Sequence, residues 1–98
     1  MKKRVVILGS TGSIGTSALT VARQIPDRME IVGLAAGTRV EDLEDQAKEF
    51  GVNHLCLAGD SRYKELQRSG RSIYTGANGL EELLEVTKPD LVLVAIVG

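Results

Sequence analysis

The chain has 98 residues, enough for one domain, and its hydrophobic content of 43% and charged content of 26% are ordinary for a globular protein. A net charge of −1 and an aromatic content of 3% give no basis for binding nucleic acid or a membrane surface. No apolar stretch approaches the ~20 residues of a membrane span. The one cysteine, Cys56, excludes an internal disulfide and fits a reducing, cytoplasmic location.

The first predicted strand and the first predicted helix flank a glycine-rich turn. Residues 4–8 are an apolar, β-branched run of the kind that forms strands. Residues 13–25 then follow the period of an amphipathic helix, which Pro26 ends. The apolar face that we expect this helix to bury consists of Ile14, Ala18, Val21, Ala22 and Ile25.

A second strand and a second helix come next. Residues 31–36 are expected to form the strand, which ends before Gly37. Thr38 and Glu41 have the spacing of a capping box, so the helix is predicted to take Thr38 as its N-cap. Gly51 suits the left-handed position that ends a helix. The apolar face of this helix consists of Val40, Leu43, Ala47 and Phe50.

The third part of the chain is less strongly patterned. Residues 54–58 predict a short third strand, and residues 72–75 predict an edge strand. Residues 60–69 between them are expected to form a weakly amphipathic helix that ends before a glycine.

The last predicted strand is the most hydrophobic. A helix is expected to start with Asn78 as its cap and Glu81 three residues later, and to be lined by Leu80, Leu83 and Leu84. Residues 91–97 are then seven apolar residues in a row, which is typical of a central parallel strand buried on both faces. The alternation predicts an α/β fold, a Rossmann-like doubly wound parallel sheet over residues 1–98. Because no helix follows residues 91–97, we expect the sheet to be truncated there and the chain to be an N-terminal fragment.

Gly9, Gly12 and Gly15 occupy the turn after the first strand, with hydroxyl residues between them. In dinucleotide-binding folds such glycines permit a tight turn, close approach of a pyrophosphate and close packing of helix on strand. The helix N-terminus adds free N–H groups. The lysine of an ATP-binding P-loop is missing, which disfavours ATP or GTP. A glycine turn without a ligand is the alternative, but the strand–turn–helix context favours a cofactor.

The end of the second predicted strand bears on which dinucleotide binds. NAD-binding domains usually place Asp or Glu there to bind the ribose 2′-hydroxyl, whereas this strand ends in Ala35-Ala36-Gly37. Thr38 and then Arg39 follow, and Arg39 is positioned where a cation accommodates the 2′-phosphate of NADP. The alternative is a solvated surface arginine. The helix dipole mildly disfavours a cation at this end, which a bound phosphate would offset.

No catalytic constellation is visible in these residues. His54 and Cys56 alternate on a short strand, and two such side chains do not make a metal site, so we interpret them as packing residues. No Ser-His-Asp or Cys-His arrangement and no pair of catalytic carboxylates is identifiable. We therefore expect residues 1–98 alone to be catalytically inactive.

Three motifs together carry a family resemblance. GSTGSIG behind the first strand, AAG at the end of the second and the closing VLVAIVG resemble the N-terminus of the 1-deoxy-D-xylulose-5-phosphate reductoisomerases, over residues 5–98. The resemblance implies a homodimeric, NADPH-dependent enzyme of the methylerythritol phosphate route to isoprenoids. It would convert the sugar phosphate 1-deoxy-D-xylulose 5-phosphate to 2-C-methyl-D-erythritol 4-phosphate with a divalent metal (Mg²⁺, Mn²⁺ or Co²⁺).

The resemblance also implies roles for particular residues. The cofactor phosphates would be held by Thr11, Gly12, Ser13 and Ile14, and the 2′-phosphate pocket would be formed by Gly37, Thr38 and Arg39. Family members often have lysine or serine and then asparagine after the AAG glycine. This chain has Thr38 and Arg39 at those two positions, so its cation lies at the second position instead of the first. The metal ligands and the substrate-binding residues of the family would lie beyond Gly98.

Two other functions remain open from the residues alone. Semialdehyde dehydrogenases and other NADP-dependent reductases carry a similar glycine turn. A stand-alone module that binds a nucleotide without catalysis is the third possibility.

Overall fold

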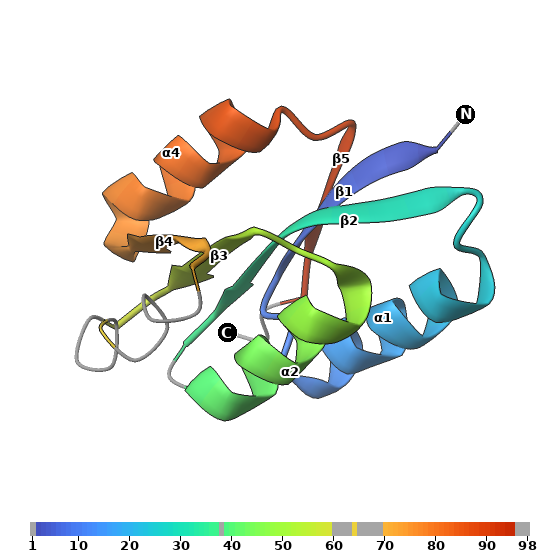
Figure 1. The fold of residues 1–98 in the computed structure, drawn as a ribbon, viewed down its shortest axis with the longest axis horizontal. Coiled ribbons are helices and arrows are strands. Elements are labelled where there is room, and N and C mark those ends of the chain that lie inside the picture. Colours follow the sequence, from blue (N-terminus) through green and yellow to red (C-terminus); the bar gives the residue numbers. More distant parts are fainter. Residues whose placement is uncertain (1, 38, 60–63, 65–69, 96–98) are drawn as a thin grey trace.

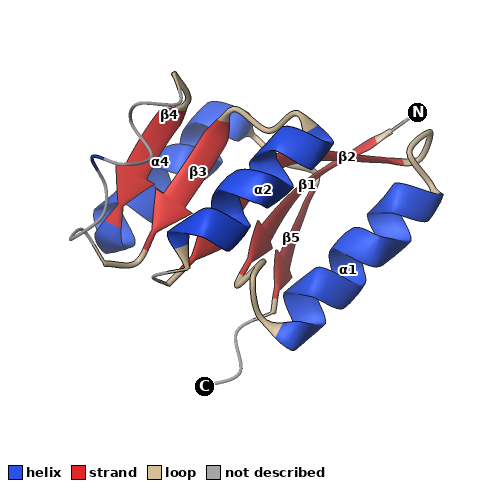
Figure 2. Cartoon of the chain, turned by 60° about the horizontal axis from the view of Figure 1, so that its bottom comes forward, coloured by secondary structure: helices blue, strands red, loops and turns tan. Residues whose placement is uncertain are grey.

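The computed structural model describes residues 2–37, 39–59, 64 and 70–95. Their strands are β1 (Lys3–Leu8), β2 (Met29–Ala36), β3 (His54–Leu57), β4 (Ser72–Thr75) and β5 (Leu91–Val94), and their helices are α1 (Ser13–Gln24), α2 (Val40–Phe50) and α4 (Gly76–Thr87). All the strand pairs are parallel, in the order β4-β3-β2-β1-β5. Figures 1 and 2 show α1 and α2 on one face of the sheet and α4 on the other, which confirms the predicted doubly wound α/β architecture.

The core has two halves because successive strand residues point to opposite faces. Val5 and Ile7 pack beneath α1 and α2, whereas Val6 and Leu8 pack with Leu83 of α4. The register places Leu8 beside Ala35 of β2 and Val94 of β5. The carboxyl ends of the strands therefore meet at one edge of the sheet, and the loops that follow them lie close together.

The buried face of α1 differs from the prediction. Ile14 and Val21, expected to be buried, are 52% and 50% exposed. Ala22 is buried as predicted, but Leu19 and Gly15, which were not predicted, complete the buried face. Gly15 packs so closely on the glycine loop that it fixes the rotation of the helix about its axis. Packing against the loop therefore outweighs the apolar stripe that the periodicity indicated.

Two predicted helix starts are also displaced. Helix α2 begins at Val40 with Arg39 at the N-cap position, rather than Thr38, which lies outside the described residues. Helix α4 begins at Gly76 directly after β4, two residues before the expected cap Asn78. The predicted C-terminal glycine of α2 is confirmed, since Gly51 adopts the left-handed conformation. The helix expected over residues 60–69 falls almost entirely outside the described residues.

Strand β5 does not have the burial that its sequence predicts. Among the described residues it pairs only with β1 and forms an edge of the sheet. Leu91, Val92 and Val94 are exposed, the last by 64%. The prediction of a central strand buried on both faces is therefore wrong for the part of the chain that the structure describes, because no described element covers β5.

We expect the 98-residue chain to self-associate through β5. An unpaired, apolar edge strand offers free backbone groups and hydrophobic surface to a second molecule. Sedimentation at increasing protein concentration should show a rising mean mass. Val94→Lys, which places a charge on this edge, should reduce the association. A single monomeric species at all concentrations would contradict the expectation.

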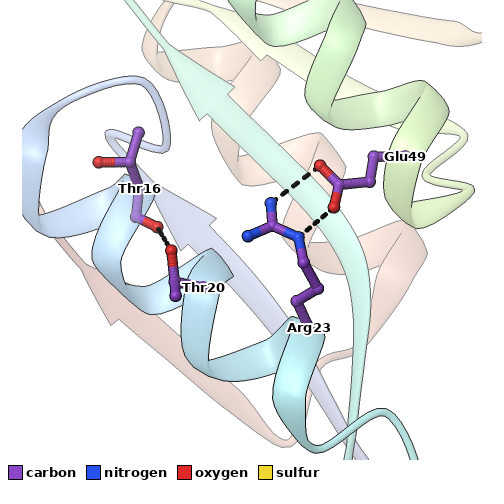
Figure 3. A network of polar contacts seen from close by, with 4 residues as sticks. All are labelled: Thr16, Thr20, Arg23 and Glu49. Carbon is purple, nitrogen blue, oxygen red and sulfur yellow. Dashed lines mark hydrogen bonds and ion pairs between the residues drawn. The ribbon is translucent and has the colours of Figure 1, made fainter.

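Helices α1 and α2 lie side by side and are linked on the surface (Figure 3). Arg23 of α1 forms a two-point ion pair with Glu49 of α2, with Nη2 2.9 Å from Oε1, and its guanidinium lies over the ring of Phe50. The hydrogen bond from Arg23 lowers the pKa of the Glu49 carboxyl. Both partners are exposed, so the pair orients the helices more than it stabilises them.

No helix among the described residues is long and apolar enough to cross a membrane.

Candidate functional site

A cleft of about 620 Å³ lies at the carboxyl edge of the sheet. Its floor is formed by the ends of β1, β2 and β3, including Leu8, Ala35 and Cys56. The glycine loop forms one wall, and the start of α4, at Gly76 and Ala77, forms another. In open parallel sheets this edge is where ligands bind.

The glycine loop is held tightly to the sheet. Gly9 has a φ of 85°, in the region that favours glycine, and the N–H groups of Gly9 and Ser10 both donate to the carbonyl of Ala35, at 2.7 and 3.0 Å. A Cβ at Gly15 would lie 2.2 Å from the carbonyl oxygen of Gly9. The absence of a side chain there lets α1 begin directly against the loop, as the motif predicted.

The N-terminus of α1 is left without a cap. Gly12 occupies the N-cap position, no side chain caps it, and the first turn contains no acidic residue. Within the described residues, the N–H groups of Thr11, Ser13 and Ile14 donate to no backbone carbonyl. Free N–H groups and the positive end of the helix dipole make this a site that favours an anion.

The residues predicted to bind a cofactor are mostly brought together here. Gly12, Ser13 and Gly37 line the cleft, whereas Thr11 and Ile14 are loop and helix residues beside it. Thr38 lies outside the described residues. The sequence patterns did not predict that α4 would form a wall of the cleft. The feature of the sequence that could have indicated it is the glycine- and alanine-containing stretch at residues 76–79.

Arg39 lies across the loop from α1. Its side chain is 66% exposed and pairs with Asp42 at 2.7 Å, and its Nη1 donates to the carbonyl of Thr11 at 3.4 Å. The guanidinium is thus beside the glycine loop and open to solvent. The nearby carboxylate of Asp42 is engaged with Arg39 rather than placed at the end of β2.

The contacts of His54 and Cys56 agree with packing roles. The Nδ1 atom of His54 lies 3.2 Å from the hydroxyl of Tyr74 on the neighbouring strand. Cys56 is buried, and its burial raises the pKa of the thiol, which favours the protonated form. Among the described residues, no three His, Cys, Asp or Glu side chains gather where they could hold a metal.

Comparison with known proteins identifies the family. The model of the family described as 1-deoxy-D-xylulose 5-phosphate reductoisomerase matches residues 5–98. Reductoisomerases so named from Phocaeicola vulgatus and Rhodococcus jostii are 39% and 46% identical over 100% and 97% of this chain, which spans 27% and 24% of their lengths.

Solved structures agree with the sequence comparison. The Zymomonas mobilis reductoisomerase in complex with NADPH matches with a TM-score of 0.89 and 32% identity, over 100% of this chain and 27% of that one. A reductoisomerase in complex with magnesium matches with a TM-score of 0.89 and 36% identity, over 100% of this chain and 26% of that one. The chain thus spans about a quarter of the length of these relatives, and it belongs to the 1-deoxy-D-xylulose 5-phosphate reductoisomerase family.

Proposed function

We propose that this chain forms the NADPH-binding part of an enzyme that converts 1-deoxy-D-xylulose 5-phosphate to 2-C-methyl-D-erythritol 4-phosphate. The observation that carries the proposal is the uncapped N-terminus of α1, whose free N–H groups lie at the cleft beside Arg39. Family membership favours this function over a semialdehyde dehydrogenase or a non-catalytic module. When bound, NADPH supplies the hydride for the reduction.

In this proposal the glycine loop holds the pyrophosphate. The N–H groups of Thr11, Ser13 and Ile14 have no backbone acceptor and would donate to phosphate oxygens. Gly12 lacks a side chain and lines the cleft, so the phosphates approach the backbone closely. The apolar floor of the cleft shields these hydrogen bonds from water.

The 2′-phosphate is proposed to bind where α2 begins. Gly37 is exposed at the end of β2, and Thr38 and Arg39 follow it. Arg39 would exchange part of its contact with Asp42 for the more highly charged phosphate. β2 ends in Ala36 and carries no carboxylate at its end, where NAD-binding domains usually place one for the ribose 2′-hydroxyl.

The remaining features are proposed for the whole protein. They are a sugar phosphate substrate, a divalent metal (Mg²⁺, Mn²⁺ or Co²⁺), a homodimeric assembly and a cytoplasmic location. A solved relative complexed with magnesium supports the metal. The residues that the structure describes contain no group of three side chains that could hold this metal. Residues 1–98 are proposed to act as one cofactor-binding unit without activity of their own.

Arg39→Ala tests the proposed cofactor preference. A charge-assisted hydrogen bond to phosphate contributes roughly 1.5–3 kcal/mol, so the variant of the complete gene product should bind NADPH about ten- to a hundredfold more weakly. NADH, which lacks the 2′-phosphate, should bind almost unchanged. Fluorescence titration with both cofactors measures this.

A matched arginine provides the control. Arg23→Ala removes an exposed arginine of α1 that pairs with Glu49, outside the proposed site, and should leave both affinities unchanged. Equal losses of NADPH and NADH in Arg39→Ala would show that Arg39 acts on a feature common to both cofactors, and the 2′-phosphate assignment would fail.

A further inference from the structure

Helix α2 reaches the glycine loop with a second side chain that no motif singled out. The amide Nε2 of Gln46 donates to the backbone carbonyl of Ser10 at 2.9 Å. Arg39, about two helical turns earlier, donates to the next carbonyl, that of Thr11. Two successive carbonyls of the loop are therefore turned toward α2.

The hydrogen bond of Gln46 is partly buried, and nearby polar atoms are left without partners in the part of the chain that the structure describes. Ser10 is 0% exposed, and Gln46 is half-buried. The Oε1 atom of Gln46 and the hydroxyl of Ser10 are buried without a hydrogen-bond partner among the described residues. An apolar side chain at position 46 would avoid one of these unpaired atoms, but it would leave the carbonyl of Ser10 without its side-chain donor.

The carbonyl of Ser10 and the N–H of Thr11 belong to one planar peptide group. In a trans peptide these two groups point in opposite directions. A donor that holds the carbonyl toward α2 therefore aims the N–H of Thr11 away from α2. That N–H is one of the donors without a backbone acceptor. The orientation of this peptide is set by ψ of Ser10 and φ of Thr11, and the hydrogen bond from Gln46 restricts its rotation.

We propose that Gln46 is a positioning residue for dinucleotide binding, which orients the Ser10–Thr11 peptide so that its N–H faces the pyrophosphate. This inference rests on the proposed function. It differs from the role of Arg39, because the pyrophosphate is common to NADPH and NADH. Loss of the Gln46 side chain should therefore weaken the binding of both cofactors equally, whereas loss of the Arg39 side chain should weaken the binding of NADPH alone.

Gln46→Met in the complete gene product tests the proposal. The variant keeps the length of the side chain but has no donor. We expect the dissociation constants of NADPH and NADH to rise together by about tenfold, with their ratio unchanged. Gln46→Glu, an acceptor of the same length, should lose at least as much and serves as the second variant if Gln46→Met does not fold.

Two variants of α2 separate positioning from general destabilisation. Lys48→Met makes the same kind of change at an exposed position and should leave both affinities unchanged. Leu43→Ala removes a fully buried side chain, so it should lower the melting temperature without changing either dissociation constant of the folded protein.

The outcomes are distinguishable. Wild-type affinity for both cofactors in folded Gln46→Met would overturn the positioning role, and so would a loss confined to NADPH. If Leu43→Ala lost as much cofactor affinity as Gln46→Met, the effect of Gln46 would be explained by general destabilisation of α2, and the positioning role would fail. If the wild-type protein bound neither dinucleotide, the proposed function itself would fail, and this inference with it.

Discussion

Gly12→Val is expected to abolish binding of NADPH and NADH while leaving the protein folded. A Cβ at Gly12 would meet only the carbonyl oxygen of Gly9, at 3.6 Å, which is an ordinary contact. The backbone there is extended, with φ −79° and ψ 175°, a conformation that valine adopts readily. The fold therefore has room for a Cβ at this position. The cleft does not, because Gly12 lines it where the pyrophosphate is proposed to approach the backbone.

Circular dichroism and cofactor titration separate the two effects of Gly12→Val. The spectrum and melting curve should match those of the wild-type protein, and saturation with NADPH should no longer be reached. Gly12→Ala adds only a single methyl group, so its affinity for NADPH should lie between those of the wild-type protein and Gly12→Val. If folded Gly12→Val bound NADPH with wild-type affinity, the loop would be only a turn.

Local sequence patterns predicted the strands well. The runs at residues 4–8 and 72–75 match β1 and β4 to within one residue, because β-branched and apolar runs have few other stable arrangements in an alternating chain. The buried face of α1 could not be predicted in the same way. Val21 and Leu19 are both apolar, and only the contact between Gly15 and the loop decides which of them faces the core.

The candidate site likewise has a part that local sequence patterns could predict and a part that they could not. Gly9, Gly12 and Gly15 were recognisable because their spacing follows from local backbone requirements at one turn. Gln46 was not recognisable, since a lone glutamine in an amphipathic helix resembles any other polar residue. Its contact with Ser10 depends on how α2 packs beside the loop, which no local pattern encodes.

Gly15→Ala should destabilise the fold, although helix propensity alone predicts the opposite. Alanine in a helix is favoured over glycine by about 1 kcal/mol. At Gly15, however, the added Cβ would lie 2.2 Å from the carbonyl oxygen of Gly9 and 2.6 Å from the Cα of Ser10. Both are backbone atoms of a loop that is hydrogen-bonded to β2, so neither moves aside cheaply. We expect a net loss of about 3 kcal/mol in the free energy of unfolding.

Gly79 of α4 supplies the matched comparison for Gly15, since both glycines are buried within helices. A Cβ at Gly79 would lie 3.1 Å from the nearest atoms of Tyr74, a distance that a shift of a few tenths of an ångström relieves. Gly79→Ala should therefore be nearly neutral, because the gain in helix propensity offsets this mild crowding. Urea unfolding followed by circular dichroism at low protein concentration measures both variants. Should Gly15→Ala prove as stable as Gly79→Ala, α1 would pack on the glycine loop less closely than its geometry indicates, and the rotation of α1 would need another cause.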